Sequence, residues 1–182
     1  EVSGGIEVAG LDTREHGPAD LAGRVGYVSQ DPESQVVSTT VRAELTLPNL
    51  REVTSESVGW TEIRGFSGDE LDLSLEGAGS MKVTCNYRVV TASLGGVGSM
   101  NIDGADNEGI DLNLHGAGYV TLHGRSKWLK ATLGGLGGLD AKHFHADSVD
   151  LELSGLGNAS VSASQNANLN LSGLGSVTVY GN

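Results

Sequence analysis

Apolar and polar residues alternate in short runs along this chain, and one such run is written six times. The first copy, LDLSLEGAGSMKV, spans Leu71 to Val83 and carries a Gly-x-Gly tripeptide at its centre. The first glycine of that tripeptide recurs after 19, 20, 19, 20 and 18 residues. A repeat of about twenty residues is typical of a solenoid, in which each supersecondary unit stacks on the one before it.

Apolar residues also hold fixed places around each tripeptide. They lie two and four positions before the first glycine and four and six positions after it, as Leu75, Leu73, Met81 and Val83 do in the first copy. This period-two alternation predicts two short strands per coil, each with one face inward, and a third, less regular side. With a degenerate earlier copy near Val58, the repeats predict an all-β, single-stranded, right-handed parallel β-helix of about seven coils. We favour the right-handed sense because left-handed coils usually show strict hexapeptide repeats, which this chain lacks.

The residue between the two glycines is apolar in every copy, whereas an exposed turn usually carries Asn, Asp or Ser there. We interpret this middle residue as pointing into the core. The flanking glycines would then adopt backbone conformations or close approaches that a Cβ would obstruct. The predicted turn and core residues are Gly77, Gly79, Gly96, Gly98, Gly116, Gly118, Gly135, Gly137, Gly155, Gly157, Gly173, Gly175, Val97, Leu136, Leu156 and Leu174.

Residues 1–48 do not share the repeat, and we interpret them as an N-terminal β segment that packs on or caps a solenoid of residues 49–182. The stretch VGYVSQDPESQ, followed by TVRAEL, resembles a Q-loop fragment of an ABC transporter ATPase of the energy-coupling-factor type. The resemblance would place the Q-loop glutamine at Gln30. The sequence has no Gly-x-x-x-x-Gly-Lys-[Ser/Thr] loop to cradle phosphates, so the segment is interpreted as a hybrid or fused piece with at most a vestigial nucleotide site.

The repeats themselves carry a second resemblance. LTLPNL, the repeated LxLSGxGSVxV and the terminal GSVTVYGN resemble the head GIN domain of auto-transporter adhesins, a family of secreted or surface-attached bacterial β-helical proteins. The resemblance covers about residues 45–182. It implies an extracytoplasmic location, whether secreted, periplasmic or at the cell surface, and it brings no catalytic or cofactor-binding residues with it.

The composition of the chain limits the classes of partner that we expect. A formal net charge of -12 argues against nucleic acid and against anionic membrane surfaces. No apolar run reaches the 18 residues that membrane insertion would need. Cys85 is the only cysteine, which excludes an intramolecular disulfide. The chain starts at Glu1, so we expect that any leader is not part of it.

A few residues could carry chemistry. His143 and His145 share a face at strand spacing and are weak candidates for a transition-metal site, although a solvated edge is the favoured interpretation. His123 is expected to stack between Asp103 and Lys142, but no nucleophile or oxyanion donor accompanies it. We therefore predict no catalytic residues, no cofactor and no enzyme.

These observations favour a non-catalytic extracytoplasmic β-solenoid that acts as a structural or adhesion-type interaction module. One alternative is a carbohydrate-binding β-helix, which would use exposed aromatic residues such as Trp60, Tyr119 and Trp128. Another is a vestigial nucleotide-binding segment at the N-terminus. The last coil would leave strand edges unpaired, so we expect self-association, end to end or side by side. A surface glycan or protein ligand is a further expected partner.

Overall fold

The structure, a computed structural model, describes residues 7–8, 11–12, 36–37, 50–56 and 58–181. Two short strands, β1 (Glu7–Val8) and β2 (Leu11–Asp12), pair antiparallel. β3 (Val36–Val37) pairs in parallel with β4 (Glu52–Ser55). Gln30 and most of the predicted N-terminal segment lie outside the described residues.

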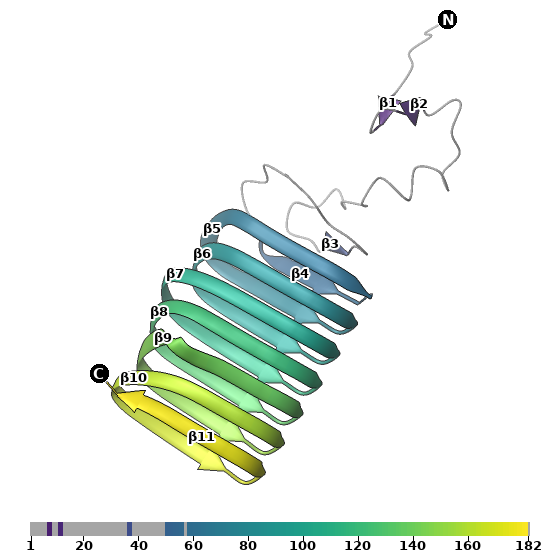
Figure 1. Cartoon of the computed structure of the whole chain (residues 1–182). Coiled ribbons are helices and arrows are strands. Elements are labelled where there is room, and N and C mark those ends of the chain that lie inside the picture. Colours follow the sequence, from purple (N-terminus) through teal and green to yellow (C-terminus); the bar gives the residue numbers. More distant parts are fainter. Residues whose placement is uncertain (1–6, 9–10, 13–35, 38–49, 57, 182) are drawn as a thin grey trace, which may run out of the picture.

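Seven long strands follow and build the solenoid. They are β5 (Gly59–Leu75), β6 (Ala78–Leu94), β7 (Val97–Leu114), β8 (Ala117–Leu133), β9 (Leu136–Leu153), β10 (Leu156–Leu171) and β11 (Leu174–Gly181). Each pairs in parallel with the next, so a single nine-stranded sheet runs from β3 to β11 in chain order. Figure 1 shows the result, a right-handed stack of about seven coils. The predicted all-β parallel β-helix is confirmed, and the described residues contain no helix.

Each coil is flattened, with two faces and two edges. At one edge the strand ends and two residues turn the chain into the next strand, as Glu76 and Gly77 do between β5 and β6. The arrowheads of β5 to β10 in Figure 1 line up along this edge, which we call the turn edge. At the other edge the strand continues but its pairing slips, for instance between Cys85 and Val89. We call this the bulge edge, and it corresponds to the less regular side that the sequence predicts.

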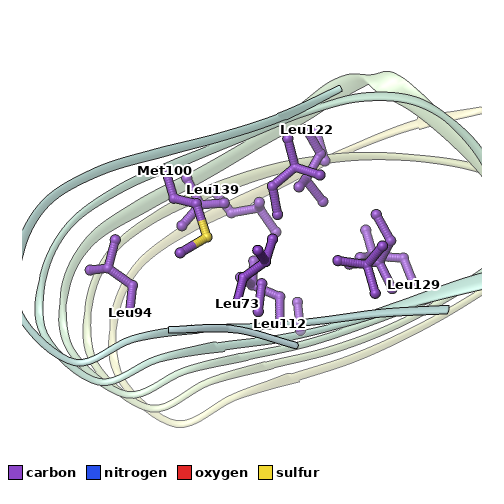
Figure 2. Packing of buried hydrophobic residues seen from close by; sticks show 14 of the residues in the cluster. Leu73, Leu94, Met100, Leu112, Leu122, Leu129 and Leu139 are labelled. Carbon is purple, nitrogen blue, oxygen red and sulfur yellow. The ribbon is translucent and has the colours of Figure 1, made fainter. Parts of the chain in front are cut away.

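The core lies between the two faces. Leu73 and Leu112 project from one face, Met100, Leu122 and Leu139 from the other, and Leu94 fills the end beside the turn edge (Figure 2). Apart from the last coil, the predicted inward positions of the six repeats are buried. There, Leu169, Leu171 and Val179 are exposed, because no described coil covers them. Each fully buried Leu or Val contributes roughly 1.5–3 kcal/mol, so stacking is what stabilises the coil.

The predicted direction of the middle residue of the tripeptide is wrong. Val97, Leu136, Leu156 and Leu174 are 60%, 54%, 49% and 75% exposed. Strand alternation gives the reason, because the new strand already begins at the middle residue and alternates from there. Leu139 is buried three residues after Leu136, and an odd separation along a strand places two side chains on opposite faces. The middle residue must therefore face solvent.

The glycines are needed because successive coils approach each other closely. A Cβ on Gly157 would lie 1.6 Å from the carbonyl oxygen of Gly137, one coil earlier. Gly137 itself has φ +138°, a conformation that other residues rarely adopt. The tripeptides are in vertical register from coil to coil, with Leu136 opposite Ala117 and Leu156.

Candidate functional site

The turn edge displays a continuous row of apolar side chains. It begins at Val58, which is 80% exposed and immediately precedes β5. From the next coil onward the pairing register places the middle residues of the tripeptides directly over one another. We call this row the apolar ladder; it consists of Val58, Ala78, Val97, Ala117, Leu136, Leu156 and Leu174. Isolated exposed apolar residues are ordinary, but a contiguous row of them marks an interaction surface.

The backbone of the turn edge is already hydrogen-bonded. The carbonyl oxygen of Leu133 accepts the amides of Ser154 and Gly155, both at 3.0 Å, and the Leu156 amide donates to Gly135 O at 3.0 Å. The same bonds recur between the other coils from β5 to β11. These amides point along the solenoid axis toward the coil before, so they are not offered to a ligand beside the edge. What the edge offers is apolar contact.

Charge is sparse around the apolar ladder. The pentapeptides centred on its last six members contain a single carboxylate, Glu76, and a single imidazole, His115, although the chain carries 23 acidic residues. Over the last four coils the edge forms a shallow depression lined by residues 115–117, 134–136, 154–156 and 172–174. Trp60 and Tyr119 border the ladder at the position after the second glycine, and both are about half exposed. They lie three coils apart, so they do not form one aromatic platform.

The bulge edge directs its large side chains inward. Tyr87 and Phe144 are fully buried, and the Tyr87 hydroxyl donates to the carbonyl oxygen of Leu50. The Asn107 side-chain amide, also buried, donates to the carbonyl oxygen of Tyr87. Burial raises the pKa of the Cys85 thiol to about 11, since a thiolate loses its hydration there. Burial likewise raises the pKa of Tyr87. Cys85 is thus a buried packing residue with little thiolate at neutral pH.

The histidine candidates are spread along the bulge edge. His123 Nδ1 lies 3.1 Å from Asp103 Oδ1, and its ring stacks on that of His143 with the centroids 6.1 Å apart. His143, and not the predicted Lys142, is therefore its neighbour, because the pairing of β8 with β9 slips between Thr121 and His123. His145 faces the next coil instead, with Nδ1 3.3 Å from Ser162 Oγ.

Two observations on the described part of the chain concern the candidate metal ligands and possible membrane-spanning helices. No three His, Cys, Asp or Glu side chains gather there in a way that could hold a metal ion. His143 and His145 therefore lack the further ligands that a transition-metal site would need. No described helix is long and apolar enough to cross a membrane.

Comparison with protein families gives one match that covers most of the chain. Residues 27–182 match the family described as "Putative auto-transporter adhesin, head GIN domain". The match begins earlier than the residue 45 expected from the repeats, so it includes part of the N-terminal segment, residues 1–48, which lacks the repeat. No solved structure matches the chain.

Curated relatives match only short stretches and belong to another class of protein. A putative ABC transporter ATP-binding protein of Pyrococcus abyssi is 44% identical over 66 residues, which is 35% of this chain and 23% of that protein. One of Streptomyces avermitilis is 55% identical over 42 residues, 23% of this chain and 8% of that protein. One of Methanosarcina mazei is 32% identical over 98 residues, 50% of this chain and 16% of that protein. The chain thus spans less than a quarter of the length of each of these relatives.

Proposed function

Since the chain belongs to the head GIN domain family, we propose that it is a non-catalytic, extracytoplasmic interaction module that adheres through its turn edge. The family description names an adhesin head and no enzyme. The observation that carries the proposal is the apolar ladder, in which Leu136, Leu156 and Leu174 stay exposed although burying each would be favourable by roughly 1.5–3 kcal/mol.

The form of the solenoid supports this function. In a stack of coils every repeat presents the same face, so one side chain per repeat produces an extended contact surface. Here that surface is held by a core of stacked leucines directly behind it, of which Leu133 and Leu153 are buried. A rigid, preorganised row loses little conformational entropy when it binds. Repetition therefore gives this edge an extended and rigid contact surface, as adhesion requires.

Attachment of chain-coated beads tests the proposal. Latex beads coated with the 182-residue chain are washed over cultured epithelial cells and over alkyl-coated glass, and retained beads are counted. The edge variant Leu136→Glu/Leu156→Glu should retain at least about tenfold fewer beads, because it places two charges in the apolar ladder. The matched control, Asn86→Glu/Gln165→Glu, adds the same charge at exposed positions of the bulge edge and should retain beads as the unmodified chain does.

Equal retention of the edge variant and the control would overturn the proposal, since adhesion would then not depend on the turn edge. Free simple sugars that release the unmodified beads would also count against it. They would favour the carbohydrate-binding alternative through residues such as Tyr119. Circular dichroism of both variants serves as the folding control and should show an intact coil, because the substituted side chains are exposed.

A further inference from the structure

We propose that the partner of the apolar ladder is a second copy of this chain, docked edge to edge about a two-fold axis with the two ladders antiparallel. This inference rests on the proposed function, because it names what the adhesive edge contacts. It follows from the spacing, the order of residue sizes and the distribution of charge along the edge.

Spacing provides the first argument. Neighbouring members of the ladder are separated by the distance between paired strands, about 4.8 Å, from Ala78 to Leu174. A second solenoid of the same sequence has that same period, so the two rows stay in step along their whole length. Dry contacts between rows of stacked strands form in this way in steric zippers.

Residue size determines the orientation. The first four members of the ladder are Val, Ala, Val and Ala, and the last three are all Leu. In an antiparallel arrangement centred on Ala117, Val58 faces Leu174, Ala78 faces Leu156 and Val97 faces Leu136. Each large side chain then meets a smaller one. In a parallel arrangement the three leucines at one end would meet leucines, while the smaller Val and Ala residues at the other end would meet each other. The bulky end would then hold the smaller end apart and leave gaps that cost contact energy, whereas the antiparallel arrangement has a small pair only at its centre, Ala117 with Ala117.

The distribution of charge supports both the choice of the turn edge as the contact and its antiparallel orientation. Two copies with a formal net charge of -12 repel each other over most of their surfaces. The turn edge is the exception, because its carboxylates are confined to the N-terminal coils at Glu56 and Glu76. In the antiparallel arrangement these residues face Ser172 and Ser154 of the second copy and lie at the opposite end of the contact from that copy's own glutamates, whereas in a parallel one the glutamates of both copies would lie at the same end.

The contact is small. Six steps of about 4.8 Å give a row of roughly 29 Å, and a strip of that length and one side chain in width covers about 300 Å² per copy. Stable dimers bury about 800 Å² per partner, so the isolated chains should associate only at high concentration. Copies crowded on one surface would nevertheless hold to copies on another, because many weak contacts act together.

Cross-linking through single introduced cysteines tests the geometry. Ala117→Cys lies at the centre of the proposed contact, so bis-maleimidoethane should couple two copies of this variant. Leu174→Cys alone should give at least about tenfold less dimer, because like positions at the ends are roughly 29 Å apart. A mixture of Val58→Cys with Leu174→Cys should cross-link again. The unmodified chain is the blank, since its Cys85 thiol is buried.

Either of two results would overturn the arrangement. Leu174→Cys coupling to itself as readily as Ala117→Cys would indicate a parallel or end-to-end contact. Absence of coupling in all variants at millimolar protein would show that the edge does not bind itself.

Sedimentation velocity measures the association without a cross-linker. Between 10 µM and 1 mM the average sedimentation coefficient of the unmodified chain should rise, while that of Leu136→Glu/Leu156→Glu stays at the monomer value. Asn86→Glu/Gln165→Glu should behave as the unmodified chain. If changing the exposed end residues Leu169 and Leu171 to Glu abolishes association and the edge variant does not, the contact is end to end and the inference falls.

Bead clustering separates this inference from the proposed function. Beads coated with the unmodified chain should cluster with each other but not with beads that carry the edge variant. Beads that attach to cells through the turn edge yet never cluster would refute self-recognition and leave the adhesive edge standing. Beads that neither attach nor cluster would refute both.

Discussion

The two edges of the solenoid belong to the same repeat but differ in regularity and in the direction of their side chains. At the turn edge the chain reverses over a strictly repeated tripeptide, and its middle side chains face solvent. At the bulge edge the length of the segment varies, the pairing slips, and large residues such as Tyr87 and Phe144 fold inward. Regularity therefore accompanies the exposed apolar surface, and irregularity accompanies the filled core.

The turn edge constrains the repeat more tightly than the bulge edge does. At the turn edge, backbone meets backbone, so glycine is required and identical coils follow one another. At the bulge edge, side chains meet side chains, so each coil can adopt its own solution, as Asn107 does when it binds the carbonyl oxygen of Tyr87. Three experiments test this difference between the edges.

The largest effect should come from one methyl group at the turn edge. In Gly157→Ala the new Cβ would lie 1.6 Å from Gly137 O. The Cβ is fixed directly to the backbone of one coil and the oxygen belongs to the backbone of the coil before, so neither can withdraw without separating the coils. We expect a loss of roughly 3 kcal/mol or more in the free energy of unfolding, measured as the midpoint of urea unfolding followed by circular dichroism. Gly134→Ala is the matched control, because its Cβ would have no neighbour closer than 3.6 Å. Equal midpoints for the two variants would contradict the close approach.

The next effect compares two leucines three residues apart. Leu133 is 2% exposed and Leu136 is 54% exposed, so the same truncation should have very different consequences. Leu133→Ala should cost about 2–5 kcal/mol by opening a cavity, whereas Leu136→Ala should cost about 0.5 kcal/mol or less. Urea midpoints again decide. A large loss in Leu136→Ala with a small one in Leu133→Ala would restore the inward direction that the tripeptide pattern suggested.

The smallest effect concerns the bulge edge, and it should be seen only above pH 9. The pKa of Cys85 is raised from 9.0 to about 11 in the folded chain, so its contribution to stability is complete below pH 9 and is lost as the pH rises toward 11. Tyr87, whose pKa is also raised, acts with the same sign. The urea midpoint should therefore be level from pH 7 to pH 9 and fall above it, less steeply in Cys85→Ala. An identical slope in that variant would show that the thiol is not the titrating group.

Much of the architecture could be predicted because both periods are strong. The period of about twenty residues specifies the coil, and the period of two identifies its inward residues, such as Leu75 and Met81, both buried. The exposed ladder could have been found by the same count. Leu75 and Met81 lie six residues apart, so a strand parity carried back from Met81 already places Ala78 outside. The tripeptide pattern predicts the opposite direction for the middle residue, because an apolar residue in a turn usually indicates burial.

Other features could not be read from the chain. The neighbours of His123 depend on where the pairing of β8 with β9 slips, and no periodic signal marks that place. The hydrogen bonds from Tyr87 to Leu50 and from Asn107 to Tyr87 join residues of different coils. Neither donor side chain belongs to the repeated pattern. Such contacts arise only when the coils are stacked.

The repeats in the sequence specify the number of coils, the vertical register of the tripeptides and most of the residues that fill the core, since repeated short-range patterns specify repeated local structure. Only the tertiary structure showed which residues meet at the bulge edge, such as His123 and His143. The physical reason is that the strand pairing slips there without a periodic signal, and a shift of one residue changes which side chains become neighbours.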